Sequence, residues 1–461
     1  MNSQPILKNR RRINFLYTLL LAVVFLPSCG GGSAEGSNDI SPSDPLLVEE
    51  EMPVVQRKPI FKRRLALFVV DFLDNRQMFP PARDIEKNLE EGVVRDYFSD
   101  ISYGQFTYDI DSFGPFTHQD NFTSLYPDHV QKVFSINTVN ISGFDADRYD
   151  LFILVTLSDY EFEAGVTIPK GYLEFRVNGE VVNSDKRVVV NPLFAGCRKR
   201  DCSGDLSPED KFQEKDFSGS PFTLFQRIFI HEFIHSLGIW EHANSRTNGS
   251  RFDYEEEIPN NRENLNYDYG NSYDIMGGAP DYHYGYNLNV GYRDWLGWLK
   301  PPRKTVIKDY GCFTTTVNPI NSVDYTVAVE IVIPEKGDRY YLEVRDFLDK
   351  WDRRGHTSEV QKIVADNRQG IMVNKKADDT ADMVFTPTLL LDMSPSPNRT
   401  EKGYEGEPDI RDVVLKPGRE YEYDAPDVRL WDVIPEGNGS FSVKIMVKRP
   451  DDEPHKSCAG Y

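Results

Sequence analysis

Residues 231–235 of the 461-residue chain read His-Glu-Phe-Ile-His. Histidine is scarce in this chain, with eight residues in all, so chance seldom produces this spacing. Residues four apart share one face of an α-helix, which lets His231 and His235 reach the same ion. Glu232 lies about 100° around that helix, beside the ion, where a base for a water molecule belongs. The spacing therefore predicts a helix that carries a zinc site.

The residues around this motif are apolar, which places the predicted helix inside a core. Two imidazoles and a carboxylate in a core are costly unless a metal ion or a polar network uses them. A solvated helix with two chance histidines is the alternative, and the apolar neighbours argue against it. These neighbours are Phe229, Ile230, Phe233, Ile234 and Leu237.

A third ligand is expected shortly after the helix. Gly238 comes three residues after the second histidine, where a helix can end in a left-handed turn. Glu241 and His242 follow side by side. Three neutral imidazoles leave the ion its full charge for acidifying water, which favours His242, but carboxylates also bind zinc and keep Glu241 as the alternative. Residues 255–257 are all glutamate, but Pro259 indicates that they lie in a loop.

The layout resembles the metzincin zinc peptidases, whose pattern is HExxHxxGxxH, with one extra residue before the last histidine. Residues 241–245, Glu-His-Ala-Asn-Ser, resemble the HAN stretch of gametolysin-type peptidases, where the histidine is the ligand. Residues 273–278, Tyr-Asp-Ile-Met-Gly-Gly, resemble the Met-turn of the family. The resemblance thus implies that His242 completes the site and that Met276 lies beneath the ion.

Two further segments resemble gametolysin-type and immune-inhibitor-A-type catalytic domains. Residues 286–299 are similar to their "YN…LGWL" ending, and residues 97–106 are similar to their "YY…SYGQ" segment. With the zinc motif and the Met-turn, the resemblance covers roughly residues 64–300.

The resemblance implies a zinc-dependent endopeptidase that hydrolyses peptide bonds of extracellular proteins. His231, His235 and His242 would hold Zn²⁺, and Glu232 would act as the general base. The alternative is a catalytically inactive peptidase fold used for adhesion or binding at the cell surface, although the retained Glu232 argues against it. One tyrosine near the Met-turn is expected to stabilise the oxyanion. The candidates are Tyr273, Tyr282, Tyr284 and Tyr286.

The start of the chain has the pattern of an export signal. Four basic residues precede an apolar run from Phe15 to Phe25, which is short for a membrane span. Residues 26–29, Leu-Pro-Ser-Cys, resemble the bacterial lipobox, which implies that Cys29 carries a lipid. We therefore expect an exported protein that is lipid-anchored to a bacterial membrane, at the cell surface or in the periplasm. An ordinary secretory signal, giving a secreted protein, is the alternative.

Four cysteines remain besides Cys29. An even number in an oxidising compartment predicts two disulfides, with three possible pairings. The most economical pairing joins Cys197 to Cys202 and Cys312 to Cys458.

The chain is acidic, with 53 basic and 73 acidic residues and a formal net charge of −20. Removal of residues 1–28, which hold four basic and no acidic residues, lowers the net charge to −24. Electrostatics therefore disfavour nucleic acid and anionic lipid, and the expected partners are a protein or peptide substrate and a membrane through the N-terminal lipid only. The acidic runs at 253–257 and 451–453 indicate either structural Ca²⁺ or a solvated surface.

Alternating strand and helix patterns predict an α/β (α+β) catalytic domain with a mixed sheet. The resemblance implies that this domain is metzincin-like and contains the zinc helix. A helix is expected over residues 85–98, and Pro221 is expected in the first turn of the zinc helix. Buried strands are expected over residues 64–70, 149–155 and 186–190.

After Pro301-Pro302, short β-rich runs separated by turn residues predict a β-sandwich-like domain. The runs cover residues 327–333, 340–344 and 441–447. The predicted organisation is a lipoprotein signal peptide (1–28), a flexible tether (29–60), a catalytic domain (61–300) and a β-sandwich-like domain (301–461).

Overall fold

The computed structural model describes most of the predicted elements. The described residues are 62–72, 81–118, 135–138, 141–156, 166–168, 174–181, 188–192, 220–239, 242–246, 266–267, 271, 273–277, 285–346, 350–352, 370–376, 388–391, 393, 413–418, 423–449 and 458. Several predicted features lie outside them: the signal and tether with Cys29, Cys197 and Cys202, Glu241, Tyr282 and Tyr284, and the acidic runs at 253–257 and 451–453.

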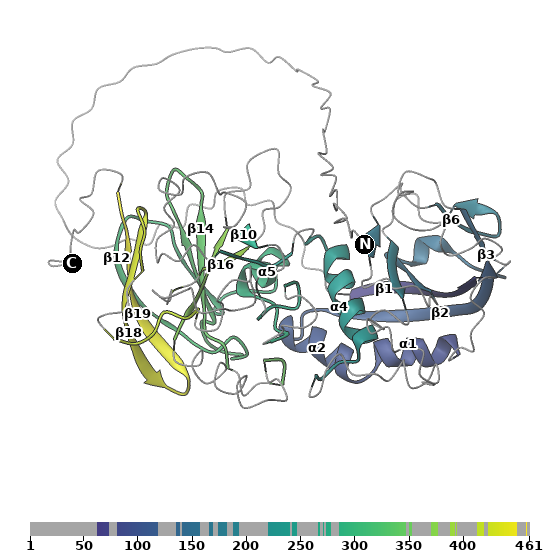
Figure 1. Cartoon of the computed structure of the whole chain (residues 1–461), viewed down its shortest axis with the longest axis horizontal. Coiled ribbons are helices and arrows are strands. Elements are labelled where there is room, and N and C mark those ends of the chain that lie inside the picture. The colour runs from purple at the N-terminus through teal and green to yellow at the C-terminus, as the bar shows by residue number, and fades with distance from the viewer. Residues whose placement is uncertain are drawn as a thin grey trace, which may run out of the picture. The chain divides into compact units, whose positions relative to one another are not determined.

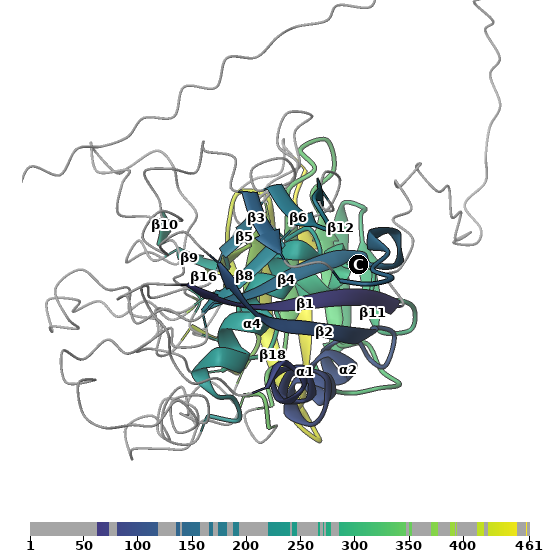
Figure 2. The same cartoon turned by 90° about the vertical axis from the view of Figure 1, so that its right-hand side faces the viewer.

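The first sheet contains five strands. They are β1 Lys62–Phe72, β2 Thr107–His118, β4 Leu151–Thr156, β5 Val166–Ile168 and β8 Val188–Pro192. Their order is β2-β1-β4-β8-β5, and Figure 2 shows β1 between β2 and β4. The first four run parallel, whereas β5 joins β8 antiparallel at the edge. β1, β4 and β8 correspond to the three strands predicted from apolar runs.

A smaller three-stranded sheet and a short 3-10 helix accompany the first sheet (Figure 1). The elements are β3 Ser135–Thr138, the 3-10 helix Ala146–Arg148, β6 Glu174–Val177 and β7 Glu180–Val181.

The helix predicted over residues 85–98 is interrupted in the structure. It forms two helices, α1 Ala82–Glu90 and α2 Val93–Ile101. Gly92 lies between them at φ +66°, a backbone conformation that glycine adopts without steric cost and that no helix continues through. The break lets both short helices turn apolar side chains to the same core, including Leu89 and Val94.

The helix that carries the histidines is α4, Leu224–Ser236. The prediction that Pro221 lies in its first turn is wrong, because the helix begins three residues later. Thr223 is the N-cap and accepts a hydrogen bond from the Gln226 amide, while the Gln226 side chain accepts one from the Thr223 amide. This capping box satisfies the free amides of the first turn and fixes the start of the helix.

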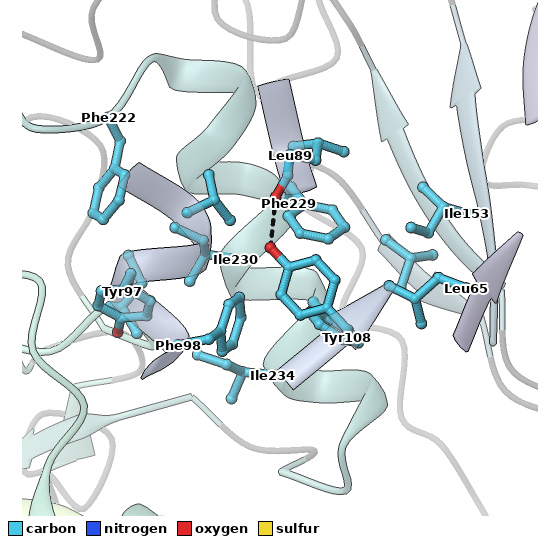
Figure 3. Close-up of a cluster of buried hydrophobic side chains, with 14 of the residues drawn as sticks. Leu65, Leu89, Tyr97, Phe98, Tyr108, Ile153, Phe222, Phe229, Ile230 and Ile234 are labelled. Atoms are coloured by element: carbon cyan, nitrogen blue, oxygen red, sulfur yellow. Dashed lines mark hydrogen bonds between the residues drawn. The ribbon is translucent and has the colours of Figure 1, made fainter. Parts of the chain in front are cut away.

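One face of the five-stranded sheet shares a core with α1, α2 and α4. Figure 3 shows Leu65 and Ile153 of the sheet beside Phe229 of α4, with the Tyr108 hydroxyl donating to the carbonyl of Leu89. The opposite face of β1 is also covered, since Phe68 is buried and its ring lies against that of Phe144 at a centroid distance of 5.7 Å. Burial on both faces accounts for the continuous apolar sequence of this strand.

Two further sheets follow in the second half of the chain. Their strands are β9 Asn244–Arg246, β10 Asn266–Tyr267, β11 Lys304–Ile307, β12 Gly311–Val317, β13 Ala328–Val332, β14 Arg339–Glu343, β15 Met372–Lys376, β16 Leu389–Leu391, β17 Tyr423–Asp424, β18 Val428–Gly437 and β19 Ser440–Val447. One sheet has the order β10-β9-β16-β15-β14-β13-β11, and the other has the order β12-β19-β18-β17. Both contribute to one apolar core, which contains Leu342 and Val373 from the first and Val443 and Ile445 from the second.

A disulfide joins Cys312 of β12 to Cys458, with a Cα–Cα distance of 6.1 Å. This is the pairing expected from the sequence for these two residues, and it fastens the end of the chain to the four-stranded sheet. The predicted partners Cys197 and Cys202 lie outside the described residues.

The second half of the chain also completes the core of the first half. Trp351 is buried in the core that contains α4, where its ring stacks on Phe222 at 5.5 Å. Its indole N–H donates to the Asp100 carboxylate at 3.0 Å, and its carbonyl accepts the Tyr286 amide at 2.8 Å. The core around the start of α4 therefore depends on a residue about 130 positions later in the chain.

The fold as described is mixed α+β, with many strands and few helices. A further short helix is α5, Val290–Trp295, whose N-cap Asn289 accepts a hydrogen bond from the Tyr292 amide. No helix among the described residues is long and apolar enough to cross a membrane.

Candidate metal centre

Three imidazoles meet at the end of α4. His231 and His235 come from the last two turns of the helix, and His242 comes from the segment that returns after Gly238. One ring nitrogen from each lies within 4.8 Å of the others. Gly238 has φ +114°, and this backbone conformation permits the turn that brings His242 back to the helix. Within the described residues this is the group of side chains that could hold a metal ion.

The protonation of two of these rings follows from their hydrogen bonds. Nδ1 of His231 lies 2.9 Å from the carbonyl oxygen of Ile275, and Nδ1 of His235 lies 2.6 Å from the carbonyl oxygen of Ile239. A carbonyl oxygen only accepts, so both Nδ1 atoms carry the proton and donate. When the two rings are neutral, both Nε2 atoms therefore present lone pairs.

These two Nε2 atoms face each other at 3.2 Å. Two neutral acceptors cannot form a hydrogen bond between them, so their lone pairs repel unless a cation lies nearby. Hydrogen bonds from Nδ1 to carbonyl groups are the usual means of orienting histidines that bind metal. The donor set therefore fits a metal ion that prefers imidazole nitrogen.

The electrostatic surroundings of His231 favour its neutral form. Loss of hydration lowers the pKa of His231 well below its usual value, and the neighbouring imidazoles of His235 and His242 lower it further. A neutral imidazole is the form that binds a metal ion, so the lowered pKa of His231 favours metal binding by this ring.

Glu232 lies next to His231 on α4 and is buried. Its position in the helix places it about 100° around the axis from His231. The helix thus brings a carboxyl group to the neighbourhood of the three imidazoles without making it a member of the group that could hold the ion.

The turn that contains Met276 lies directly against the histidines. The carbonyl of Ile275 accepts from His231, and the carbonyl of Met276 accepts the amide of Ala243, the residue after His242. Met276 is fully buried in the core shared with α4. This turn therefore fixes two of the three histidines. It binds the side chain of His231 directly, and it holds His242 through the backbone of the next residue.

Asp274 holds this turn in shape, a role that our sequence analysis did not predict. One carboxylate oxygen accepts the Met276 amide at 2.7 Å, and the other accepts the backbone and side-chain N–H groups of Asn289 at 2.6 and 2.7 Å. Burial raises the pKa of Asp274 to about 6, although these hydrogen bonds oppose the shift. An Asp two residues before the residue it caps is a known turn signal, and this signal was available in the sequence.

Gly277 ends the turn at a point where two backbone segments leave no space. A Cβ atom added there would lie 2.8 Å from the Ala243 carbonyl oxygen and closer still to that of Asn271. The amide of Asn271 also donates to the Ala243 carbonyl, so the segment after His242 is bound on both sides. Glycine at this position allows the close approach of the turn to the third histidine.

Replacing Gly277 by alanine should weaken metal binding by about tenfold or more, because the added methyl group must displace the backbone beside His242. Competition for Zn²⁺ with a chromophoric chelator measures this affinity. Gly437→Ala is the control, since a Cβ atom there meets nothing within 4 Å and only the positive φ of Gly437 (+80°) opposes the change. A folded Gly277→Ala variant with the affinity of the wild type would contradict this account.

Two segments that carry the family resemblance lie against each other. The Gln105 side chain donates to the Trp298 carbonyl at 2.7 Å, and the rings of Phe106 and Trp298 are 5.8 Å apart. The Tyr103 hydroxyl accepts from the Arg293 guanidinium at 3.0 Å. The two segments, residues 97–106 and 286–299, therefore pack against each other. Neither contributes a side chain to the group of histidines.

The tyrosines proposed for oxyanion stabilisation differ in their surroundings. Tyr286 is buried with its ring on Phe222, at the opposite end of α4 from the histidines, and its hydroxyl donates to Ser220 at 3.1 Å. This places Tyr286 in the core. Tyr273 is also fully buried.

Comparison with protein-family models gave no match, and comparison with curated proteins gave no significant match.

Proposed function

We propose that this protein is a zinc-dependent endopeptidase of the metzincin type. The observation that carries the proposal is the pair of Nε2 atoms 3.2 Å apart, both with lone pairs exposed by the hydrogen bonds at Nδ1 and both close to a third imidazole. Three neutral imidazoles are the ligand set of a catalytic zinc ion, which keeps one position free for water or substrate.

In this proposal His231, His235 and His242 hold the ion. When bound, zinc supplies a Lewis acid that lowers the pKa of a water molecule and polarises a carbonyl group. The protein contributes the fixed orientation of the rings, since Ile275 and Ile239 each hold one Nδ1–H group.

Glu232 is the proposed general base. A carboxylate oxygen of Glu232 accepts a proton from the attacking water and later donates it to the nitrogen of the leaving amine. Burial of Glu232 limits the exposure of this carboxylate to bulk water.

The edge of the first sheet supports a peptide as substrate. β5 is the edge strand of that sheet as described, and α4 lies against both β8 and β5. An extended peptide can add to such an edge through main-chain hydrogen bonds, largely independently of its side chains. A protein or peptide chain bound in this way would run beside the helix that carries the histidines.

The rival function is a binding protein that retains the peptidase fold without activity. Cleavage of casein or gelatin by the full exported chain distinguishes the two. We expect cleavage that is abolished by a zinc chelator, unaffected by a non-chelating isomer of the same compound, and restored by added Zn²⁺. Purified protein that contains about one zinc ion per chain and cleaves neither substrate would favour the rival function.

Export, a lipid at Cys29 and anchoring to a bacterial membrane belong to the same proposal and rest on the sequence alone. Structural Ca²⁺ at the acidic runs also stays a prediction, because both runs lie outside the described residues.

A further inference from the structure

The strand that follows the third histidine belongs to the sheet of the C-terminal half. His242 and Ala243 lead directly into β9, and β9 pairs in parallel with β16. In this register Ser245 lies opposite Leu390. β16 in turn pairs with β15, and β15 pairs with β14. The chain that carries the third imidazole is therefore fixed to a strand almost 150 residues later.

A second connection joins the same strand to the turn that contains Met276. Thr388, immediately before β16, is fully buried, and its hydroxyl accepts the side-chain N–H of Asn289 at 3.0 Å. Asn289 also donates to Asp274, and Asp274 accepts the Met276 amide. Three consecutive hydrogen bonds thus connect β16 to the backbone that holds His231 and Ala243.

The position of Thr388 is itself closely constrained. A Cβ atom added to Gly291 of α5 would lie 2.9 Å from the Thr388 methyl carbon, so α5 approaches this residue closely. The same helix is also fixed to β14, because Glu343 of β14 accepts the Val290 amide at 2.8 Å. Glu343 in turn forms a buried ion pair with Arg345 at 2.9 Å. A strand held by such contacts has little freedom to shift.

We infer that β16, together with Thr388, is a positioning element for the metal centre and sets the location of His242. His231 and His235 have a rigid helix to hold them, whereas His242 lies on a returning segment whose next element is β9. The metal affinity of the site then depends on the C-terminal sheet, because this sheet holds the segment that carries His242 in place. The inference rests on metal binding by the three histidines and not on peptidase activity.

Thermodynamic linkage gives a test that needs no substitution. If β16 positions His242, binding of Zn²⁺ must stabilise β16 in return. Amide hydrogen exchange of the full chain, with and without Zn²⁺, should show slower exchange at residues 388–391 as well as at 242–246 when the metal is present. β12 in the other sheet reports the global stabilisation by the metal, and the slowing at residues 388–391 should exceed the slowing at β12. Slower exchange confined to α4 and residues 242–246 would overturn the inference.

Variants test the part played by Thr388. Thr388→Val removes the hydroxyl and should weaken Zn²⁺ binding about tenfold, with an altered Co²⁺ absorption spectrum, whereas Thr388→Ser keeps the hydroxyl and should restore both. Thr326→Val is the matched control, because it removes a hydroxyl that bonds to Thr305 and Pro302 at the opposite edge of the same sheet. An unchanged affinity in Thr388→Val would overturn the role of Thr388.

The outcome for the wild-type chain separates this inference from the proposed function. A wild-type protein that binds no Zn²⁺ would overturn both. A protein that binds Zn²⁺ with slower exchange at β16 but cleaves no peptide would support the positioning element and refute the peptidase.

Discussion

Replacing Glu232 by alanine should lower peptide hydrolysis by about 100-fold or more and leave close to one zinc ion per chain. The carboxylate is proposed to carry a proton and is not a member of the histidine group, so its removal affects turnover and not metal content. Initial rates with a fluorogenic peptide, measured beside zinc content in the same preparation, test both parts of this expectation.

Glu232→Gln provides the matched control for this experiment. Glu232 is buried, so alanine leaves a cavity, whereas glutamine keeps the volume and removes only the ability to accept the proton. Equal losses of activity in both variants would assign the effect to proton transfer. Loss of a general base should lower the rate by about 100-fold or more. A Glu232→Gln variant that keeps more than about a tenth of the wild-type rate would therefore exclude this role.

Replacing His242 by alanine should weaken zinc binding by orders of magnitude, because a water molecule then takes the place of a pre-oriented ligand. Glu241→Ala is the companion variant and should keep nearly full occupancy. Zinc content and affinity of the two purified proteins decide between them. The grouping of His242 with the two helix histidines favours this expectation.

The opposite pattern would make Glu241 the third ligand. Loss of zinc in Glu241→Ala with normal binding in His242→Ala would mean that the family spacing HExxHxxGxxH applies without an extra residue. His242 would then have a role near the metal other than that of a ligand, since its ring is 5.4 Å from that of His231 and 5.1 Å from that of His235.

Local patterns in the sequence predicted individual elements well. The apolar runs placed β1, β4 and β8, and the His-Glu-x-x-His spacing placed α4, because burial and helical periodicity act over a few neighbouring residues. The helix boundaries were less predictable. Gly92 divides the expected first helix, and Thr223 caps the histidine helix where Pro221 was expected to open it.

Contacts between distant segments could not be read from the sequence. His242 was expected near His231 because Gly238 can end the helix in a turn and because residues 241–245 resemble the HAN stretch of gametolysin-type peptidases. The pairing of β9 with β16 and the hydrogen bond from Asn289 to Thr388 join residues about 100 to 150 positions apart. No periodicity or turn signal encodes such a distance, so the supports of the candidate site became visible only in the structure.

Trp351 has a consequence for how this protein unfolds. The residue belongs by sequence to the C-terminal half, but it fills the core next to Phe222 at the start of α4. Neither half can expose its interior without opening the other, so the halves should lose structure in one cooperative step. A chain that ended near residue 300 would lack both this tryptophan and the partner of β9. Evolution could therefore not exchange the C-terminal half as an independent module without rebuilding the core around the histidine helix.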